Sequence, residues 1–183
     1  QTGATLKYFY LTDDYSLDIE DYKSKLSEKT KVVAFTAASN VLSCYIPVKE
    51  MVQAAKEIGA LVVLDGAQYT AHHKVDVQDL GCDLYAFSGH KLFSPMGVGV
   101  LYGKMEVLED MRPYNYGGDM IEYVHEQETT FAPVPEKFEA GTQNVGDVYA
   151  LGVAIDFMNE IGLENIEKYE QDLTQYAAGK MRD

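Results

Sequence analysis

The apolar positions of the chain change their spacing several times, and each spacing predicts a different element. Continuous apolar runs predict buried strands, over residues 31–37, 60–64, 83–87 and 98–102. A fifth strand-like run, Leu6 to Leu11, comes near the start. Apolar residues three and four positions apart predict helices, over residues 19–26, 48–58, 147–161 and 163–182. Strands that are apolar throughout, rather than alternating, indicate a sheet covered on both faces.

Polar, Pro and Gly residues set the boundaries of these elements. Asp18 is a suitable N-cap, Pro47 suits a first helical turn, and Gly59 ends the second helix. Residues 112–147, rich in Gly, Pro, Tyr and charge, are predicted to be a long irregular segment of the kind that is functional or interfacial. The order of elements predicts an α/β fold with a mainly parallel, mixed sheet. In such sheets ligands bind beyond the carboxyl ends of the strands.

Composition narrows the class of protein. The 183 residues suit one domain, and the formal net charge of −14 argues against nucleic acid or an anionic membrane as partner. The longest apolar stretch, about five residues, is too short to span a bilayer. Two cysteines fit a reducing cytoplasm. Because the sequence starts at Gln1 and stops at Asp183 within a helical pattern, we expect a single domain, residues 1–183, from the middle of a longer polypeptide.

Five polar residues follow strand ends and are expected to gather at one edge of the sheet: Asp65, Gln68, Ser88, His90 and Lys91. A lysine between two buried strands needs a partner or a reaction, because lysine is rarely buried. Its amine can form a Schiff base with a carbonyl compound such as pyridoxal phosphate (PLP). Asp65 could then pair with the ring nitrogen of the cofactor and Gln68 with its phenolic oxygen. Ser88 and His90 could bind its phosphate.

Each of these residues also has an ordinary interpretation. Asp65 could be a turn residue or helix cap, and Gln68 could simply be exposed. Ser88 begins a common Ser-Gly turn, His90 could be structural, and Lys91 could extend to solvent. No single residue decides between the interpretations. The combination of the five, in this order, favours a PLP site.

The sequence resembles a known family. "LVVLDGAQ" followed by "HHKVDVQDLGCDLYAFSGHKLFSPMGVGVLYG" is similar to the PLP site of class V aminotransferases, and in particular of SufS-type (group II) cysteine desulfurases and selenocysteine lyases. "TKVVAFTAASNVLS", "RPYNYGGDMI" and "KFEAGTQNVGDVYALGVAIDF" resemble further segments of the same family. The departures are local: "SCYIP" follows the asparagine loop, and "FSPMG" replaces a Gly-Pro. The resemblance implies the fold-type I PLP-dependent transferase large domain, and a homodimer.

The resemblance also implies roles for individual residues. The family's Schiff-base lysine falls on Lys91, and its cofactor-binding residues fall on Asn40, Asp65, Gln68, Ser88, His90 and Thr142. In the family, the threonine matching Thr142 reaches the phosphate of the neighbouring subunit. No metal is implied.

The function implied is that of a cysteine desulfurase, which converts L-cysteine to L-alanine and passes persulfide sulfur to an acceptor protein for iron–sulfur cluster assembly. The family's persulfide-forming cysteine and carboxylate-binding arginine would lie beyond Asp183. Cys44 and Cys82 do not match that cysteine, and Cys82 is predicted to be a small buried residue. We therefore expect the 183-residue chain to be inactive by itself. A selenocysteine lyase, an aminotransferase and a non-catalytic dimerisation module remain alternatives.

Overall fold

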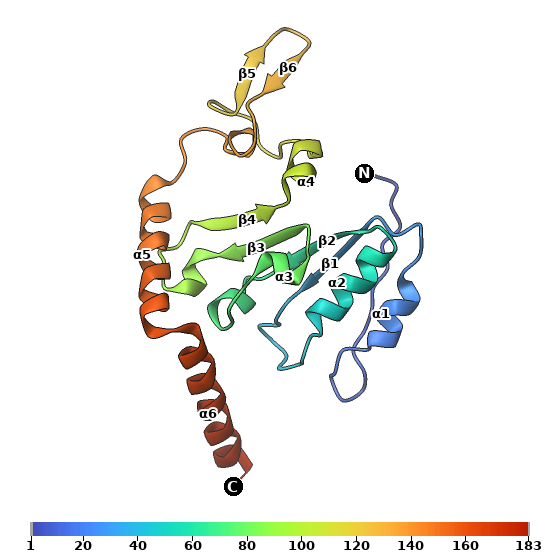
Figure 1. The fold of residues 1–183 in the computed structure, drawn as a ribbon, viewed down its shortest axis with the longest axis vertical. Coiled ribbons are helices and arrows are strands. Elements are labelled where there is room, and N and C mark those ends of the chain that lie inside the picture. The colour runs from blue at the N-terminus through green and yellow to red at the C-terminus, as the bar shows by residue number, and fades with distance from the viewer. Residues whose placement is uncertain (1, 183) are drawn as a thin grey trace.

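The computed structural model describes residues 2–182, and its centre is a four-stranded sheet (Figure 1). The strands lie side by side in chain order: β1 (Val32–Thr36), β2 (Leu61–Asp65), β3 (Leu84–Ser88) and β4 (Gly99–Gly103). β1, β2 and β3 pair in parallel, whereas β4 pairs antiparallel to β3. The predicted α/β class and the mainly parallel, mixed sheet are therefore confirmed.

Six α-helices accompany the sheet in the described residues: α1 (Ile19–Lys25), α2 (Val48–Glu57), α3 (Val77–Leu80), α4 (Met105–Asp110), α5 (Val145–Ile161) and α6 (Leu163–Arg182). Sequence signals explain where several of them begin. The carboxylate of Asp18 accepts a hydrogen bond from the Asp21 amide at 2.8 Å, and Asn144 caps α5 in the same way. The apolar stripe of α2 is buried, as its spacing predicted.

The core lies between one face of the sheet and helices α1 to α3. Val33, Val62, Leu64 and Tyr85 point into it from three strands, together with Tyr22 of α1. The sequence predicted helices over both faces of the sheet, and helices α1 to α3 cover this one. The opposite face is more open in the described residues, since Val32 is 55% exposed and Leu101 51% exposed.

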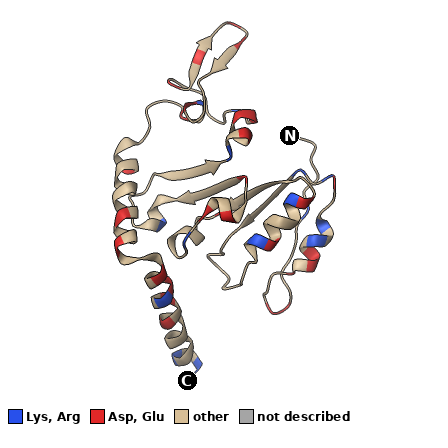
Figure 2. Ribbon diagram, viewed as in Figure 1, with Lys and Arg blue, Asp and Glu red and all other residues tan. Residues whose placement is uncertain are grey.

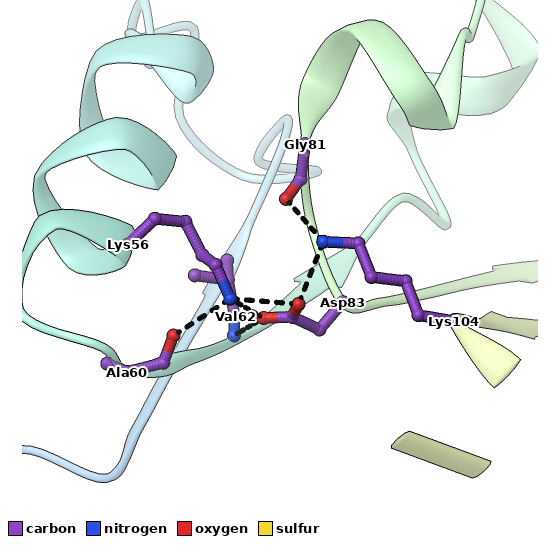
Figure 3. A network of polar contacts seen from close by, with 6 residues as sticks. All are labelled: Lys56, Ala60, Val62, Gly81, Asp83 and Lys104. Carbon is purple, nitrogen blue, oxygen red and sulfur yellow. Dashed lines mark hydrogen bonds and ion pairs between the residues drawn. The ribbon is translucent and has the colours of Figure 1, made fainter. Parts of the chain in front are cut away.

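A buried carboxylate joins the amino-terminal ends of β2 and β3 (Figure 3). Asp83 is 2% exposed and accepts hydrogen bonds from Lys56 Nζ at 2.8 and 2.9 Å, from Lys104 Nζ at 3.0 Å and from the Val62 amide at 2.8 Å. Lys56 also donates to the carbonyl of Ala60, and Lys104 to that of Gly81. This cluster ties α2, β2, β3 and the end of β4 together.

Two expectations about secondary structure are wrong. Residues Leu6 to Leu11 form no strand; only an isolated bridge joins Leu11 to Leu17. Leu6 and Tyr8 are largely exposed, while Phe9 packs edge-on against Tyr22. The Tyr10 amide donates to the Asp21 carboxylate at 3.1 Å, and the Tyr10 carbonyl accepts from the Asp18 amide at 3.2 Å, so these contacts hold the segment in place of a strand ladder. Residues 112–147 are not wholly irregular, because they contain a hairpin of β5 (Ile121–Val124) and β6 (Thr129–Phe131), which projects from the sheet (Figure 1).

Charged side chains lie mainly on the helices and the connections, and the strands of the main sheet carry few (Figure 2). Helix α6 mixes both signs, with basic residues in its last turn, where they suit the helix dipole. Across residues 2–182, no helix is both long and apolar enough to cross a membrane.

Candidate functional site

The candidate site begins where β2 ends. Asp65 is the last residue of β2, and its Oδ1 accepts a hydrogen bond from the Ala67 amide at 2.9 Å. Its side chain is exposed, so most of the carboxylate remains available to a ligand. Asp65 pairs in register with Ala86 of β3, which places the end of β3 beside it.

Gly66 allows the chain to turn closely after Asp65. A Cβ at this position would lie 2.0 Å from the ring of Tyr85, so no other residue fits without movement of the core. The Tyr85 hydroxyl is 2.9 Å from Thr70 Oγ1, which in turn donates to the Gly66 carbonyl at 2.7 Å. Burial raises the pKa of Tyr85 to about 12. Tyr85 therefore stays neutral and supports the turn that carries Asp65.

Lys91 lies on the 3₁₀ helix that follows β3, residues Gly89–Leu92. Its Nζ donates a hydrogen bond to Gln68 Oε1 at 3.0 Å, across from the turn after β2. The two residues are half-buried. The structure thus brings together a lysine and a glutamine that are 23 positions apart.

Ser88 and His90 flank the start of the same 3₁₀ helix. Ser88 Oγ lies 2.8 Å from His90 Nδ1. Between them, the Gly89 amide donates to the Val98 carbonyl at 2.9 Å, which fixes the start of the loop to β4. A hydroxyl and an imidazole are thereby presented next to each other at the carboxyl end of β3.

Asn40 and Thr142, the other two predicted cofactor-binding residues, lie apart from this group of contacts. Asn40 follows β1 and is exposed, and Thr142 is exposed just before α5. Within residues 2–182, no hydrogen bond links either side chain to Asp65, Ser88 or Lys91. Their roles remain predictions.

His72, which no sequence pattern singled out, touches this site, and Glu170 in turn contacts His72. His72 Nε2 lies 3.4 Å from Gln68 Nε2, and His72 Nδ1 lies 2.8 and 2.9 Å from the carboxylate oxygens of Glu170 on α6. The two histidines at residues 72–73 lie in the segment that resembles the family's PLP site, but nothing in the sequence connects them to α6.

The two cysteines differ in their surroundings. Cys82 is fully buried, as predicted, and burial raises the pKa of its thiol, which keeps it protonated. Cys44 is half-buried in the loop before α2. Cys82 is therefore a packing residue.

The donor set at this edge fits PLP. A carboxylate with spare capacity, an amine, a carboxamide, a hydroxyl and an imidazole lie at the ends of two adjacent strands. The carboxylate matches a protonated ring nitrogen, the amine an aldehyde and the carboxamide a phenolic oxygen. The hydroxyl and the imidazole together match a phosphate.

Comparison with known proteins identifies the family. A family profile described as "Aminotransferase class-V" matches residues 1–183. The chain belongs to the class V aminotransferase family. Enzymes of this family are PLP-dependent, in agreement with the donor set. The family also has the fold that the sequence predicted.

Relatives within this family carry a narrower name. A "Probable cysteine desulfurase" of Halalkalibacterium halodurans is 49% identical over 182 residues, which is 100% of this chain and 45% of that protein. A protein with the same name from Streptomyces coelicolor is 47% identical over 99% of this chain and 43% of its own length. The chain therefore spans less than half the length of these relatives.

Solved structures agree with the sequence relatives. The cysteine desulfurase CsdA of Escherichia coli superposes with a TM-score of 0.90 at 34% identity, covering 94% of this chain and 43% of that one. A cysteine desulfurase from Thermococcus onnurineus NA1 gives 0.89 at 36% identity, with the same coverage. This class V aminotransferase chain thus has the fold of one part of a cysteine desulfurase.

Proposed function

We propose that this chain is the cofactor-binding part of a PLP-dependent cysteine desulfurase that acts on L-cysteine. The observation that carries the proposal is the position of Lys91: its Nζ lies 3.0 Å from Gln68 Oε1, on the 3₁₀ helix after β3 that also carries His90 and begins after Ser88. The names of the relatives support the choice of substrate.

PLP, when bound, supplies an aldehyde that reacts with amines and a ring that withdraws electrons from a bound amino acid. Lys91 Nζ would hold the aldehyde of the bound cofactor. As a free amine it would take and return a proton at Nζ, since a lysine amine can serve as a general base and acid. The carboxamide oxygen of Gln68 keeps Nζ pointed toward the end of β2.

Asp65 would hold the protonated ring nitrogen, because its carboxylate is exposed and accepts only the Ala67 amide among the described residues. Ser88 and His90 would donate to the phosphate. Asn40 would line the same sheet edge from the end of β1. Thr142 would contribute to the phosphate site of a second copy, which makes a homodimer part of the proposal.

The complete protein, in this proposal, is of the SufS type and extends beyond both ends of this chain. The chain would then be the central part of a single PLP-binding domain. A cysteine outside residues 1–183 would receive the sulfur and pass it to an acceptor protein for iron–sulfur cluster assembly. The two free cysteines suit a cytoplasmic location.

The test is covalent trapping. The chain is incubated with PLP, reduced with borohydride, digested and mapped by mass spectrometry. We expect a pyridoxyl label on Lys91 and its complete loss in Lys91→Ala, with unchanged circular dichroism. Lys29→Ala is the matched control, because Lys29 is exposed before the amino end of β1 and its loss should leave the label on Lys91. A label on other lysines, with none on Lys91, would contradict the proposal.

The substrate is tested in the longer protein that contains this chain. L-cysteine should yield equal amounts of alanine and enzyme-bound sulfur. Asp65→Asn should lower kcat more than it raises KM, because the carboxylate stabilises charge that develops in the transition state. Transfer of the amino group to a keto acid, without sulfur release, would instead indicate an aminotransferase.

A further inference from the structure

A row of four side chains leads from the candidate site to helix α6. Lys91 Nζ contacts Gln68 Oε1 at 3.0 Å, Gln68 Nε2 lies 3.4 Å from His72 Nε2, and His72 Nδ1 lies 2.8 Å from Glu170 Oε1. The four residues come from the loop after β3, the turn after β2, the end of a 3₁₀ helix and α6. We propose that His72 and Glu170 are positioning residues, which fix the orientation of the Gln68 side chain and through it the amine of Lys91.

Glu170 determines which nitrogen of His72 carries the proton. An ionised carboxylate only accepts hydrogen bonds, and both of its oxygens lie within 2.9 Å of Nδ1. Nδ1 must therefore be the protonated nitrogen. In the neutral ring Nε2 is then left with a lone pair, which faces Gln68.

The lone pair on His72 in turn determines the orientation of the Gln68 amide. Its NH₂ group can donate to His72 Nε2, whereas its oxygen could not. With the NH₂ group directed at His72, the oxygen faces Lys91, which as an ammonium has only donors. One arrangement therefore satisfies every pair in the row. If His72 Nε2 carried a proton, the Nε2–H group and the Gln68 NH₂ group would be two donors facing each other. The Gln68 amide would then favour the flipped orientation, in which its NH₂ group faces the lysine.

The neighbouring histidine provides an internal comparison. His73 Nδ1 lies 3.4 Å from Glu167 Oε1, one helical turn before Glu170 on α6. Its ring packs against Tyr69, with 4.4 Å between centroids, and it has no described hydrogen bond to Gln68. Both pairs attach α6 to the 3₁₀ helix Tyr69–Ala71 and are similarly exposed. The Glu170 pair alone reaches Lys91 through Gln68.

The inference rests on the proposed function for its effect on PLP, but the tautomer of His72 can be measured without PLP. The chain is labelled with ¹⁵N-histidine, and long-range proton–nitrogen correlation spectra report which nitrogen of His72 is protonated. We expect Nδ1–H in the wild type and in Glu170→Gln, whose amide oxygen can still accept. We expect a shift toward Nε2–H in Glu170→Ala, and no change at His72 in Glu167→Ala.

The second measurement is the rate of borohydride-trapped labelling of Lys91 at saturating PLP. Loss of one orienting hydrogen bond should slow labelling roughly three- to tenfold in Glu170→Ala. Glu170→Gln should restore the rate, and Glu167→Ala should stay within about twofold of wild type. Because the Glu170 side chain is 41% exposed, its removal should leave the melting curve close to that of Glu167→Ala.

The outcomes separate the two proposals. If Lys91 takes no label in the wild type, the proposed function fails, while the tautomer spectra still decide the role of Glu170. A wild-type His72 protonated at Nε2 would overturn the inference, even with full labelling of Lys91. So would equal labelling rates in Glu170→Ala and Glu167→Ala.

Discussion

Two polar clusters containing lysine lie at opposite ends of β2 and β3. The amino-end cluster consists of Asp83, Lys56 and Lys104 (Figure 3). The carboxyl-end cluster consists of Asp65, Gln68 and Lys91. Both combine a carboxylate at a strand end with lysine at the same edge of the sheet, so residue type alone does not distinguish them.

Their hydrogen bonding does distinguish them. Asp83 is 2% exposed, and its two oxygens accept from two lysines and one backbone amide, which uses nearly all of a carboxylate's capacity. Asp65 is exposed and accepts only from the Ala67 amide among the described residues. A fully paired, buried carboxylate contributes to the stability of the native state. An exposed carboxylate that accepts a single hydrogen bond remains free to bind a ligand.

The largest effect on stability should come from removing the buried carboxylate. Asp83→Ala leaves the Val62 amide without its acceptor and two lysines without their carboxylate partner, and we expect a loss of about 2–4 kcal/mol in the free energy of unfolding. This lies toward the lower end for buried pairs, because the side chains of Lys56 and Lys104 are 37% and 30% exposed. Asp65→Ala should lose less than about 1 kcal/mol. Urea unfolding measures both; equal losses would contradict the comparison.

A substitution next to Asp65 should have an intermediate effect. Gly66→Ala places a methyl group against the Tyr85 ring, which is 1% exposed and cannot move without disturbing the core. We expect a loss of about 1–3 kcal/mol by overpacking. The control is Gly152→Ala in α5, where a Cβ meets no atom within 4 Å. That substitution should instead stabilise the helix by up to about 1 kcal/mol. A neutral Gly66→Ala would show that the turn is loose.

A further, smaller effect should appear in the pH dependence of stability. Burial raises the pKa of Asp83, but hydrogen bonds from Lys56, the Val62 amide and Lys104 outweigh it, so the pKa lies below its usual value. The unfolded chain then binds this proton more readily. The contribution of Asp83 is therefore present above the unfolded pKa and is lost as pH falls through the lower folded pKa.

The measurement compares wild type with Asp83→Asn in urea from pH 6 down to pH 3. The difference between their free energies of unfolding should be constant near pH 6 and should shrink toward pH 3. A constant difference between wild type and Asp83→Asn over the whole range would contradict the lowered pKa of Asp83.

The smallest effect is expected at Ser94, within the loop that carries Lys91. Ser94 is 8% exposed, and its hydroxyl has no hydrogen-bond partner among the described residues. A buried hydroxyl without a partner is destabilising, so Ser94→Ala should raise the free energy of unfolding by about 1 kcal/mol. Thermal unfolding would detect a melting temperature a few degrees higher. A decrease would mean that the hydroxyl is satisfied in solution.

The sequence predicted the carboxyl-end cluster well, because every member follows an apolar run. Runs ending at Leu64 and Phe87 located two parallel strands, and parallel strands end at the same edge. Lys91 and Gln68 therefore had to be close. The strand boundaries were correct to within one or two residues for the same reason.

Contacts between distant segments could not be predicted in this way. Asp83 appeared only as the first residue of a strand, since its partners lie 27 and 21 positions away on other elements. Glu170 is 98 positions from His72, and only the placement of α6 brings them together. The β5–β6 hairpin was missed because its strands are short and exposed on both faces. Local patterns carry no information about such pairings.

The antiparallel pairing of β3 with β4 limits how the loop between them can change in length. Ser88 is opposite Gly99, and the Gly89 amide bonds the Val98 carbonyl, so residues 89–98 are closed by backbone pairing at both ends. An inserted or deleted residue here would shift Lys91 relative to the strands or break this closure. The tip between β5 and β6 is exposed and distant from the main sheet (Figure 1). Length variation and engineered insertions should therefore be tolerated at residues 125–128 and not at residues 89–98.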